Sequence, residues 1–141
     1  MTNRKRRFVL DTNLVVSAFL RKNSSSRQAF DLAQRLGVIL LSASIVNELE
    51  DVLQRKKFDK YISLDERLDL LAVFIAQAEI IAVSLSINAC RDPKDNKFLE
   101  LAVEGKADSI ISGDEDLLVL HPFSGIQILT PRQFIDRDQA P

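Results

Sequence analysis

Short apolar segments alternate with longer segments of helical periodicity along this chain. The short segments are rich in β-branched residues and predict strands over residues 8–10, 38–41, 80–83, 109–111 and 126–129. The longer ones predict helices over residues 14–21, 26–36, 45–55, 65–78, 95–104, 115–120 and 132–136, with Pro131 in the first turn of the last. This alternation is typical of an α/β domain in which helices cover a central parallel sheet of about five strands.

Length and composition indicate one compact domain. A chain of 141 residues, 46% of them hydrophobic, can bury one core of ordinary size. We therefore predict a single domain over residues 1–141, with residues 1–6 as a flexible basic N-terminus. The formal net charge of −1 argues against a protein that binds nucleic acid with its whole surface, so any polyanion must meet a local patch.

The chain offers few soft metal ligands. Cys90 is its one cysteine and His121 its one histidine, which excludes an internal disulfide and a structural zinc site, so a metal must be bound by oxygen atoms. The apolar run after the basic N-terminus is interrupted by Asp11 and Asn13, unlike a signal peptide, and no apolar segment approaches membrane-spanning length. We expect a soluble cytoplasmic protein that does not contact a membrane.

Acidic residues stand where two predicted strands end. Asp11 follows the first strand, and Asp114 follows the fourth after Ser112 and Gly113. Because parallel strands end at a common edge, both acids should lie on the same rim of the sheet. An aspartate between two apolar segments, such as Asp11, is unfavourable as a charged group unless it is paired or binds a metal.

Each further acid also has a purely structural explanation. Glu48 shares the apolar face of its predicted helix with Ile45 and Val52, or merely flanks that face. Asp95 lies in a first helical turn that Asp92 can cap, and the helix dipole favours a carboxylate there.

Capping explains other polar residues as well. Asp114 or Asp116 can cap the short helix over residues 115–120, and Thr12 or Asn13 can cap the first helix, which for Thr12 is the interpretation we favour.

Convergence of these acids would create a metal site. Three or four carboxylates within a few ångström repel one another, and a hard divalent cation relieves that repulsion. Mg²⁺ or Mn²⁺ at such a site lowers the pKa of a bound water and stabilises charge on phosphate oxygens. The pattern therefore indicates cleavage of phosphodiesters without a histidine base.

Four segments in order carry a family resemblance: VLDTN, SIVNELEDVL, RDPKDNKFLELA and ADSIISGDEDLL. Together they resemble the PIN-domain family of metal-dependent ribonucleases, and more narrowly its bacterial and archaeal group of toxins from toxin–antitoxin systems. The resemblance extends over almost the whole chain, to the closing IQILTPRQFI.

The resemblance implies a three-layer α/β/α fold, an acidic pocket that binds Mg²⁺ or Mn²⁺, endonucleolytic cleavage of RNA and a cognate antitoxin protein. The positions that match the family's four catalytic and metal-binding acids are Asp11, Glu48, Asp95 and Asp114, and the frequent fifth metal-binding acid is matched by Asp116. The small polar positions that orient the acids or the water are matched by Thr12, Asn13 and Ser112.

Two surfaces are predicted to contact partners. Arg21, Lys22 and Arg27 follow the first predicted helix and are predicted to contact RNA at the pocket rim. The apolar residues of the helix over 65–78 are spread too widely for one narrow stripe, which predicts a homodimer or partner interface, or else burial on two sides.

Two other functions stay open from the sequence. A metal-dependent phosphatase-like enzyme also uses an aspartate after its first strand, but the haloacid-dehalogenase pattern requires a second aspartate where this chain has Asn13. A non-catalytic RNA-binding scaffold with a retained acidic pocket is disfavoured by the intact acids and by the lack of a basic, aromatic-rich platform.

Overall fold

The computed structural model describes residues 5–138. Its centre is a five-stranded sheet in the order β3-β2-β1-β4-β5, in which all neighbouring strands are parallel. The strands are β1 (Arg6–Leu10), β2 (Gly37–Leu41), β3 (Glu79–Ile80), β4 (Ser109–Ile111) and β5 (Gln127–Leu129). The predicted parallel α/β fold of about five strands is confirmed.

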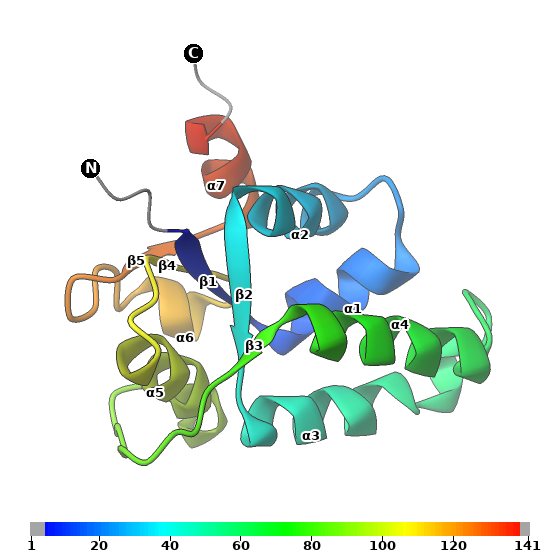
Figure 1. Ribbon diagram of the computed structural model, residues 1–141, viewed down its shortest axis with the longest axis horizontal. Helices are drawn as coiled ribbons and strands as arrows, with labels where there is room; N and C mark the ends of the chain where they lie inside the picture. Colours follow the sequence, from blue (N-terminus) through cyan, green and yellow to red (C-terminus); the bar gives the residue numbers. More distant parts are fainter. Residues whose placement is uncertain (1–4, 139–141) are drawn as a thin grey trace.

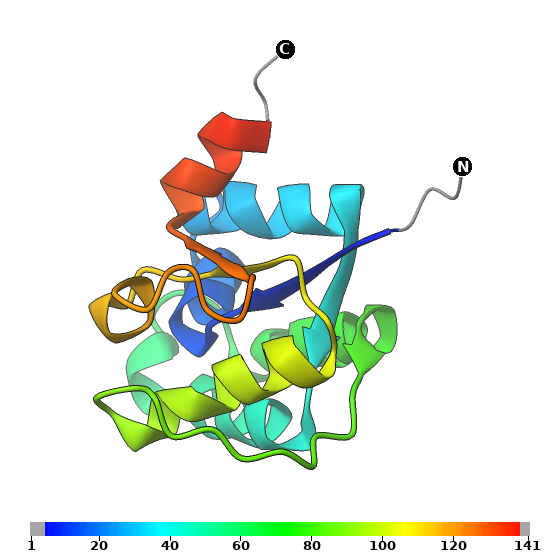
Figure 2. The ribbon, with the colours of Figure 1, turned by 90° about the vertical axis from the view of Figure 1, so that its left-hand side faces the viewer.

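Helices cover the sheet on both sides. They are α1 (Thr12–Leu20), α2 (Ser25–Leu36), α3 (Ala43–Leu53), α4 (Leu64–Gln77), α5 (Asn96–Glu104), α6 (Glu115–Leu118) and α7 (Pro131–Asp138), with 3-10 turns η1 (Lys56–Phe58) and η2 (Pro93–Asp95). Helix α5 packs against β1, β2 and β4, whereas α2 packs against β1, β2, α1 and α7. Figures 1 and 2 show β1 between α2 and α5, which is the expected three-layer arrangement.

The core lies between these layers. Phe8 and Val9 of the central strand β1 and Ile110 of its neighbour β4 are completely buried, because both faces of a parallel sheet are covered. On one side, Phe19, Phe30 and Phe74 join α1, α2 and α4, with ring centroids 5.1 to 6.0 Å apart. In the described part of the chain, no helix combines the length and apolar character needed to cross a membrane.

A buried arginine fixes the end of α3. Arg67 of α4 is fully buried, and its guanidinium donates to the carbonyls of Leu53 at 2.7 Å and Ile62 at 2.6 Å and to the carboxylate of Asp59 at 2.9 Å. A buried charge is tolerated when its hydrogen bonds are satisfied in this way. Helix α3, which carries Glu48, is therefore tied to α4 at its carboxyl end.

Gly37 allows β1 and β2 to approach closely. A Cβ atom at Gly37 would lie 1.9 Å from the carbonyl oxygen of Arg6, which belongs to the neighbouring backbone. We expect Gly37→Ala to lower the free energy of unfolding by about 2 kcal/mol, measured by urea denaturation, because the strands must separate. Gly113→Ala is the matched control, since a Cβ there meets nothing within 4 Å. Equal losses in the two variants would contradict this explanation.

The edge strand β3 is shorter than predicted. The sequence predicts a strand over residues 80–83, whereas β3 is Glu79–Ile80. Its partner β2 ends at Leu41, whose carbonyl accepts the Ile81 amide at 2.8 Å, and α3 begins at Ala43, so strand pairing stops there. Beyond the predicted strand, the amides of Ser84 and Ile87 donate to Glu104 and Glu100 of α5, each at 3.0 Å.

The N-terminal prediction is tested only in part. Of the basic segment 1–6, residues 1–4 lie outside the described residues. Arg6 is the first residue of β1, and its Nη1 lies 2.6 Å from Asp138 Oδ1, so Arg6 is not part of a flexible terminus.

Candidate active site

Asp11 stands at the carboxyl end of β1 and begins α1. Its Oδ1 accepts the Leu14 amide at 2.7 Å, and its Oδ2 accepts the hydroxyl of Ser112. Burial raises the pKa of this carboxyl, because only 5% of the residue is exposed. The hydrogen bonds from Ser112 and Leu14 lower the pKa, and the charge of Asp114 raises it.

The cap of α1 differs from the prediction. Asp11 is the N-cap, so the expectation that Thr12 or Asn13 caps this helix is wrong. The physical reason is that Asp11 keeps the extended backbone of a cap, with φ −73° and ψ 163°, whereas Thr12 is already helical. The Thr12 hydroxyl is thereby free to donate to Glu48 Oε1, and Asn13 is exposed beside the acids.

Ser112 links the ends of β1 and β4. Its hydroxyl donates to Asp11 and accepts the Asp114 amide at 2.9 Å. Asp114 in turn caps α6, since its Oδ1 accepts the Asp116 amide at 2.9 Å. The parallel sheet thus brings Asp11 and Asp114 to one rim, as the strand order predicts.

Glu48 faces this rim from α3. Ile45 and Leu49 of the same helix are buried, while the Glu48 side chain is 30% exposed at the edge of that apolar face. One carboxylate oxygen accepts the Thr12 hydroxyl, and the other lies 2.8 Å from Lys97 Nζ of α5. Three helices therefore meet at this carboxylate.

Asp95 approaches from the start of α5. Asp92 accepts the Lys94 amide at 3.0 Å, as predicted for a cap, whereas Asp95 makes no capping hydrogen bond. Burial, a hydrogen bond with Asp114 and the charges of Asp114 and Asp92 together raise the pKa of Asp95 to about 6. The charge of Lys97 lowers this pKa.

Four of the five predicted acids line one pocket, and the fifth, Asp116, lies beside two of them. Oxygens of Asp95, Asp114 and Asp116 lie within 4.8 Å of one another. Asp11 and Glu48 line the same pocket of about 250 Å³ as Asp95 and Asp114. Asp116, the secondary acid in the sequence, therefore belongs to the tightest group.

A second hollow adjoins this pocket. Its volume is about 570 Å³, and it shares Asp11, Asn13 and Asp114 with the first. Its other lining residues include Ser17, Ser26 and Pro131. The acids thus stand where two depressions meet.

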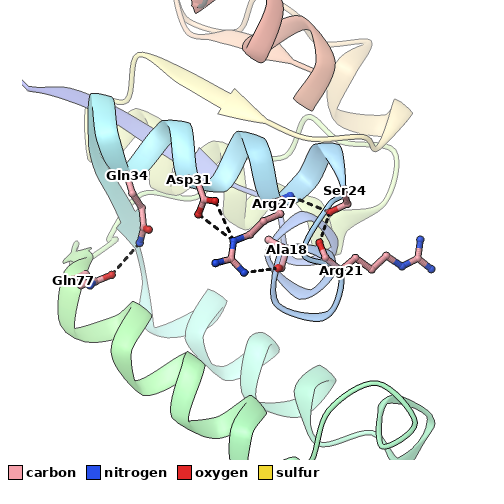
Figure 3. Close-up of polar contacts among 7 residues, drawn as sticks. All are labelled: Ala18, Arg21, Ser24, Arg27, Asp31, Gln34 and Gln77. Carbon is pink, nitrogen blue, oxygen red and sulfur yellow. Dashed lines mark hydrogen bonds and ion pairs between the residues drawn. The ribbon is translucent and has the colours of Figure 1, made fainter.

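Arg27 lies away from the acids. Its Nε lies 3.1 Å from Asp31 Oδ1, and its Nη1 donates to the Ala18 carbonyl at 3.4 Å, between α2 and α4 (Figure 3). It lines a separate small pocket together with Phe30 and Phe74.

Arg21 and Lys22 are exposed at the end of α1, where the Arg21 carbonyl accepts the Ser24 hydroxyl at 2.8 Å (Figure 3). Like Arg27, these two described residues line neither hollow at the acids.

Several residues at the site carried no recognisable signal in the sequence. Lys97 pairs with Glu48, and Arg91 Nε lies 3.1 Å from Asp116 Oδ1. Asn96 is buried, and its Oδ1 accepts the Cys90 amide at 2.8 Å, which fixes the loop before Asp95. The position of Asn96 directly after Asp95 is a weak sequence signal for a role at the site. The two ion pairs leave no such signal, because their partners are distant in the sequence.

The donor set fits a hard divalent cation. Asp95, Asp114 and Asp116 offer only oxygen atoms, and they are partly exposed, as Mg²⁺ or Mn²⁺ with retained water requires. Cys90 does not compete as a ligand, because burial and the neighbouring acids raise its thiol pKa to about 11.

Metal-free protein should be less stable at pH 7 than at pH 5. Between the ordinary aspartate pKa of about 3.9 and the folded value of about 6, Asp95 holds more proton in the folded state. The free energy of unfolding therefore falls as the pH rises through this window. For a partly exposed group we expect a difference of about 1 kcal/mol, measured by urea denaturation in chelator.

Asp95→Asn provides the control for this pH dependence. The variant should lose most of the fall in unfolding free energy between pH 5 and pH 7 that Asp95 causes. Any contribution of His121, whose Nδ1 accepts the Ile128 amide, is common to both proteins and cancels in the comparison. Identical pH profiles for the wild type and the variant would contradict the assignment.

Comparison with known sequences identifies a family. The PIN domain family matches residues 7–116. The uncharacterized protein MJ1680 of Methanocaldococcus jannaschii is 32% identical over 142 residues, which cover 94% of this chain and 91% of that protein.

Solved structures show the same fold. VapBC2 from Rickettsia felis, bound to a DNA fragment from its promoter, has a TM-score of 0.60 at 17% identity and covers 88% of this chain and 98% of its own. PAE2754 from Pyrobaculum aerophilum has a TM-score of 0.61 at 11% identity, with 94% and 89% covered. DNA-bound VapBC from Salmonella typhimurium has a TM-score of 0.60 at 16% identity, with 89% and 98% covered. The family match spans most of the chain, and the chain belongs to the PIN-domain family.

Proposed function

We propose that this protein is a Mg²⁺- or Mn²⁺-dependent endoribonuclease. PIN domains are generally nucleases, and the observation that carries the proposal is the convergence of Asp95, Asp114 and Asp116 beside Asp11 and Glu48. A divalent cation bound there supplies activation of a water molecule and stabilisation of charge on the phosphate.

The acids have separate proposed roles. Asp95, Asp114 and Asp116 would hold the cation, since their oxygens lie closest together. Asp11 and Glu48 each accept hydrogen bonds at both oxygens, so we propose that they orient water and substrate around it. This assignment is narrower than the sequence prediction, in which all five acids are metal ligands.

The substrate would cross the junction of the two hollows. Arg55 and Lys94 line the acidic pocket, and their charges would meet phosphate groups of the RNA backbone. They are better placed for this than Arg21, Lys22 and Arg27, which line neither hollow. We propose that the enzyme acts on RNA in the cytoplasm.

Cleavage of labelled RNA tests this proposal. Purified protein should cleave single-stranded RNA internally with Mg²⁺ or Mn²⁺, and excess chelator should abolish the reaction. A single-stranded DNA of the same sequence serves as the control for the sugar. Cleavage that persists in chelator, or faster cleavage of DNA than of RNA, would contradict the proposal.

A cognate antitoxin and a second copy of this chain are the proposed partners. Two structural neighbours are VapBC complexes, which supports a toxin paired with an antitoxin. Helix α4 leaves Leu64, Leu70 and Val73 exposed while Leu71 and Phe74 are buried, so apolar surface is available for an interface. A monomeric mass by light scattering would contradict the homodimer.

A further inference from the structure

Lys97 places a cation beside the acidic pocket, against Glu48 in its lining. Its Nζ lies 2.8 Å from Glu48 Oε2, donates to the Lys94 carbonyl, and stands 5.3 Å from the centre of the Phe98 ring. Only 15% of the Lys97 side chain is exposed. The ammonium group is therefore held by three contacts and largely removed from water.

Both oxygens of Glu48 already have a partner in this arrangement. Oε2 pairs with Lys97, and Oε1 accepts the hydroxyl of Thr12. A divalent ion at Glu48 would have to displace this ammonium group or lie against its like charge.

The opposite side of the pocket differs. Asp95, Asp114 and Asp116 present oxygens to one another within 4.8 Å. Arg91 pairs with Asp116 there, but 86% of its side chain is exposed, so a divalent cation displaces it readily.

We propose that Lys97 is a resident counter-cation that holds Glu48 and limits the pocket to one divalent ion, bound by Asp95, Asp114 and Asp116. This inference rests on the metal-binding part of the proposed function. Lys97 is then a positioning residue, because it fixes Glu48 without contacting the substrate. Its ammonium group neutralises the charge of Glu48 in place of a second metal ion.

Calorimetric titration with MnCl₂ alone tests this assignment. We expect about one Mn²⁺ per chain for the wild type and about two for Lys97→Met, because freed Glu48 becomes available to a second ion. The double variant Lys97→Met/Glu48→Gln should return to about one. Circular dichroism shows whether each variant is folded.

Charge-matched variants serve as controls. Lys97→Arg keeps the cation and should bind about one Mn²⁺. Lys94→Met removes an exposed cation that lines the acidic pocket, and it should also bind about one Mn²⁺. A second ion in Lys94→Met would show that general electrostatics, and not Lys97, sets the stoichiometry, which overturns the inference.

Glu48→Gln in the wild-type background gives a test that does not depend on the folding of Lys97→Met. It should weaken Mn²⁺ binding much less than Asp114→Asn, which should weaken it by more than about tenfold. Strong weakening by Glu48→Gln, or a single ion in folded Lys97→Met, overturns the inference but leaves the nuclease intact. Failure of folded wild-type protein to bind Mn²⁺ overturns both.

Discussion

Asp114→Asn is expected to lower the rate of metal-dependent RNA cleavage by about 10³-fold. Asp114 is the acid that touches most of the site: it belongs to the closest carboxylate group, hydrogen-bonds with Asp95 and is linked through Ser112 to Asp11. Metal assistance contributes several kcal/mol to such reactions, and each 1.4 kcal/mol corresponds to about tenfold in rate. Single-turnover cleavage of labelled RNA measures the change.

The choice of asparagine keeps the fold. The Asp114 Oδ1 atom caps α6 by accepting the Asp116 amide, and an asparagine oxygen caps a helix equally well. The free energy of unfolding of the variant should therefore stay within about 0.5 kcal/mol of the wild type.

Glu115→Gln removes the same charge from an adjacent exposed position that lines the larger hollow but lies outside the acid cluster, and it is the matched control for charge near the substrate. A comparable loss of activity in Glu115→Gln would show that net charge, and not the geometry of Asp114, explains the effect.

Mn²⁺ is expected to stabilise the wild-type protein by about 2.7 kcal/mol at a concentration 100 times its dissociation constant. Burial is the largest cause of the raised pKa values of Asp95 and Asp11, and the charge of Asp114 raises both pKa values further, so a bound cation relieves an unfavourable charge. A cation that binds only the folded state therefore stabilises the protein against unfolding. Urea denaturation with and without Mn²⁺ measures this effect. Unfolding that is indifferent to millimolar Mn²⁺ would contradict a shared metal site.

Asp11→Asn should have opposite effects on the two states of the protein. Without metal it removes a buried charge and retains acceptors and donors for Leu14 and Ser112, so stability at pH 7 should rise by about 1 kcal/mol. Mn²⁺ should stabilise Asp11→Asn less than it stabilises the wild type, because the variant lacks a negative charge beside Asp114. Asp51→Asn, on the exposed face of α3, should alter neither quantity.

The sequence predicts the strand ends well because their burial is a local property. Asp11 and Asp114 each follow a short apolar run, and parallel strands necessarily end at one edge, so their proximity follows from the fold class. Helix boundaries are less exact. The sequence predicts Thr12 as the N-cap of α1, one residue after the observed cap Asp11, because Asp11, Thr12 and Asn13 all have side chains suited to capping.

The extent of β3 could not be read from its own residues. The segment after Ile80 keeps the alternation of a strand, and its side chains alternate between partly buried and exposed positions. Pairing depends on the neighbour, however, and β2 ends at Leu41. The Ile81 amide still bonds to the Leu41 carbonyl, whereas farther along the chain the amides of Ser84 and Ile87 bond to Glu104 and Glu100.

By itself the sequence determined the parallel α/β fold and the edge of the sheet that carries Asp11 and Asp114. These follow from periodicity and from strand ends. Asp116 was indicated as a metal ligand only by the family resemblance.

Only the tertiary structure decided how the acids divide between tight clustering and internal pairing. Lys97 of α5 pairs with Glu48 of α3, and Arg67 of α4 donates to the carbonyl of Leu53 in α3. Both lysine and arginine are residue types that usually lie on the surface. Such contacts are set by how helices pack, because the energy of a buried charge depends on partners that are distant in the chain.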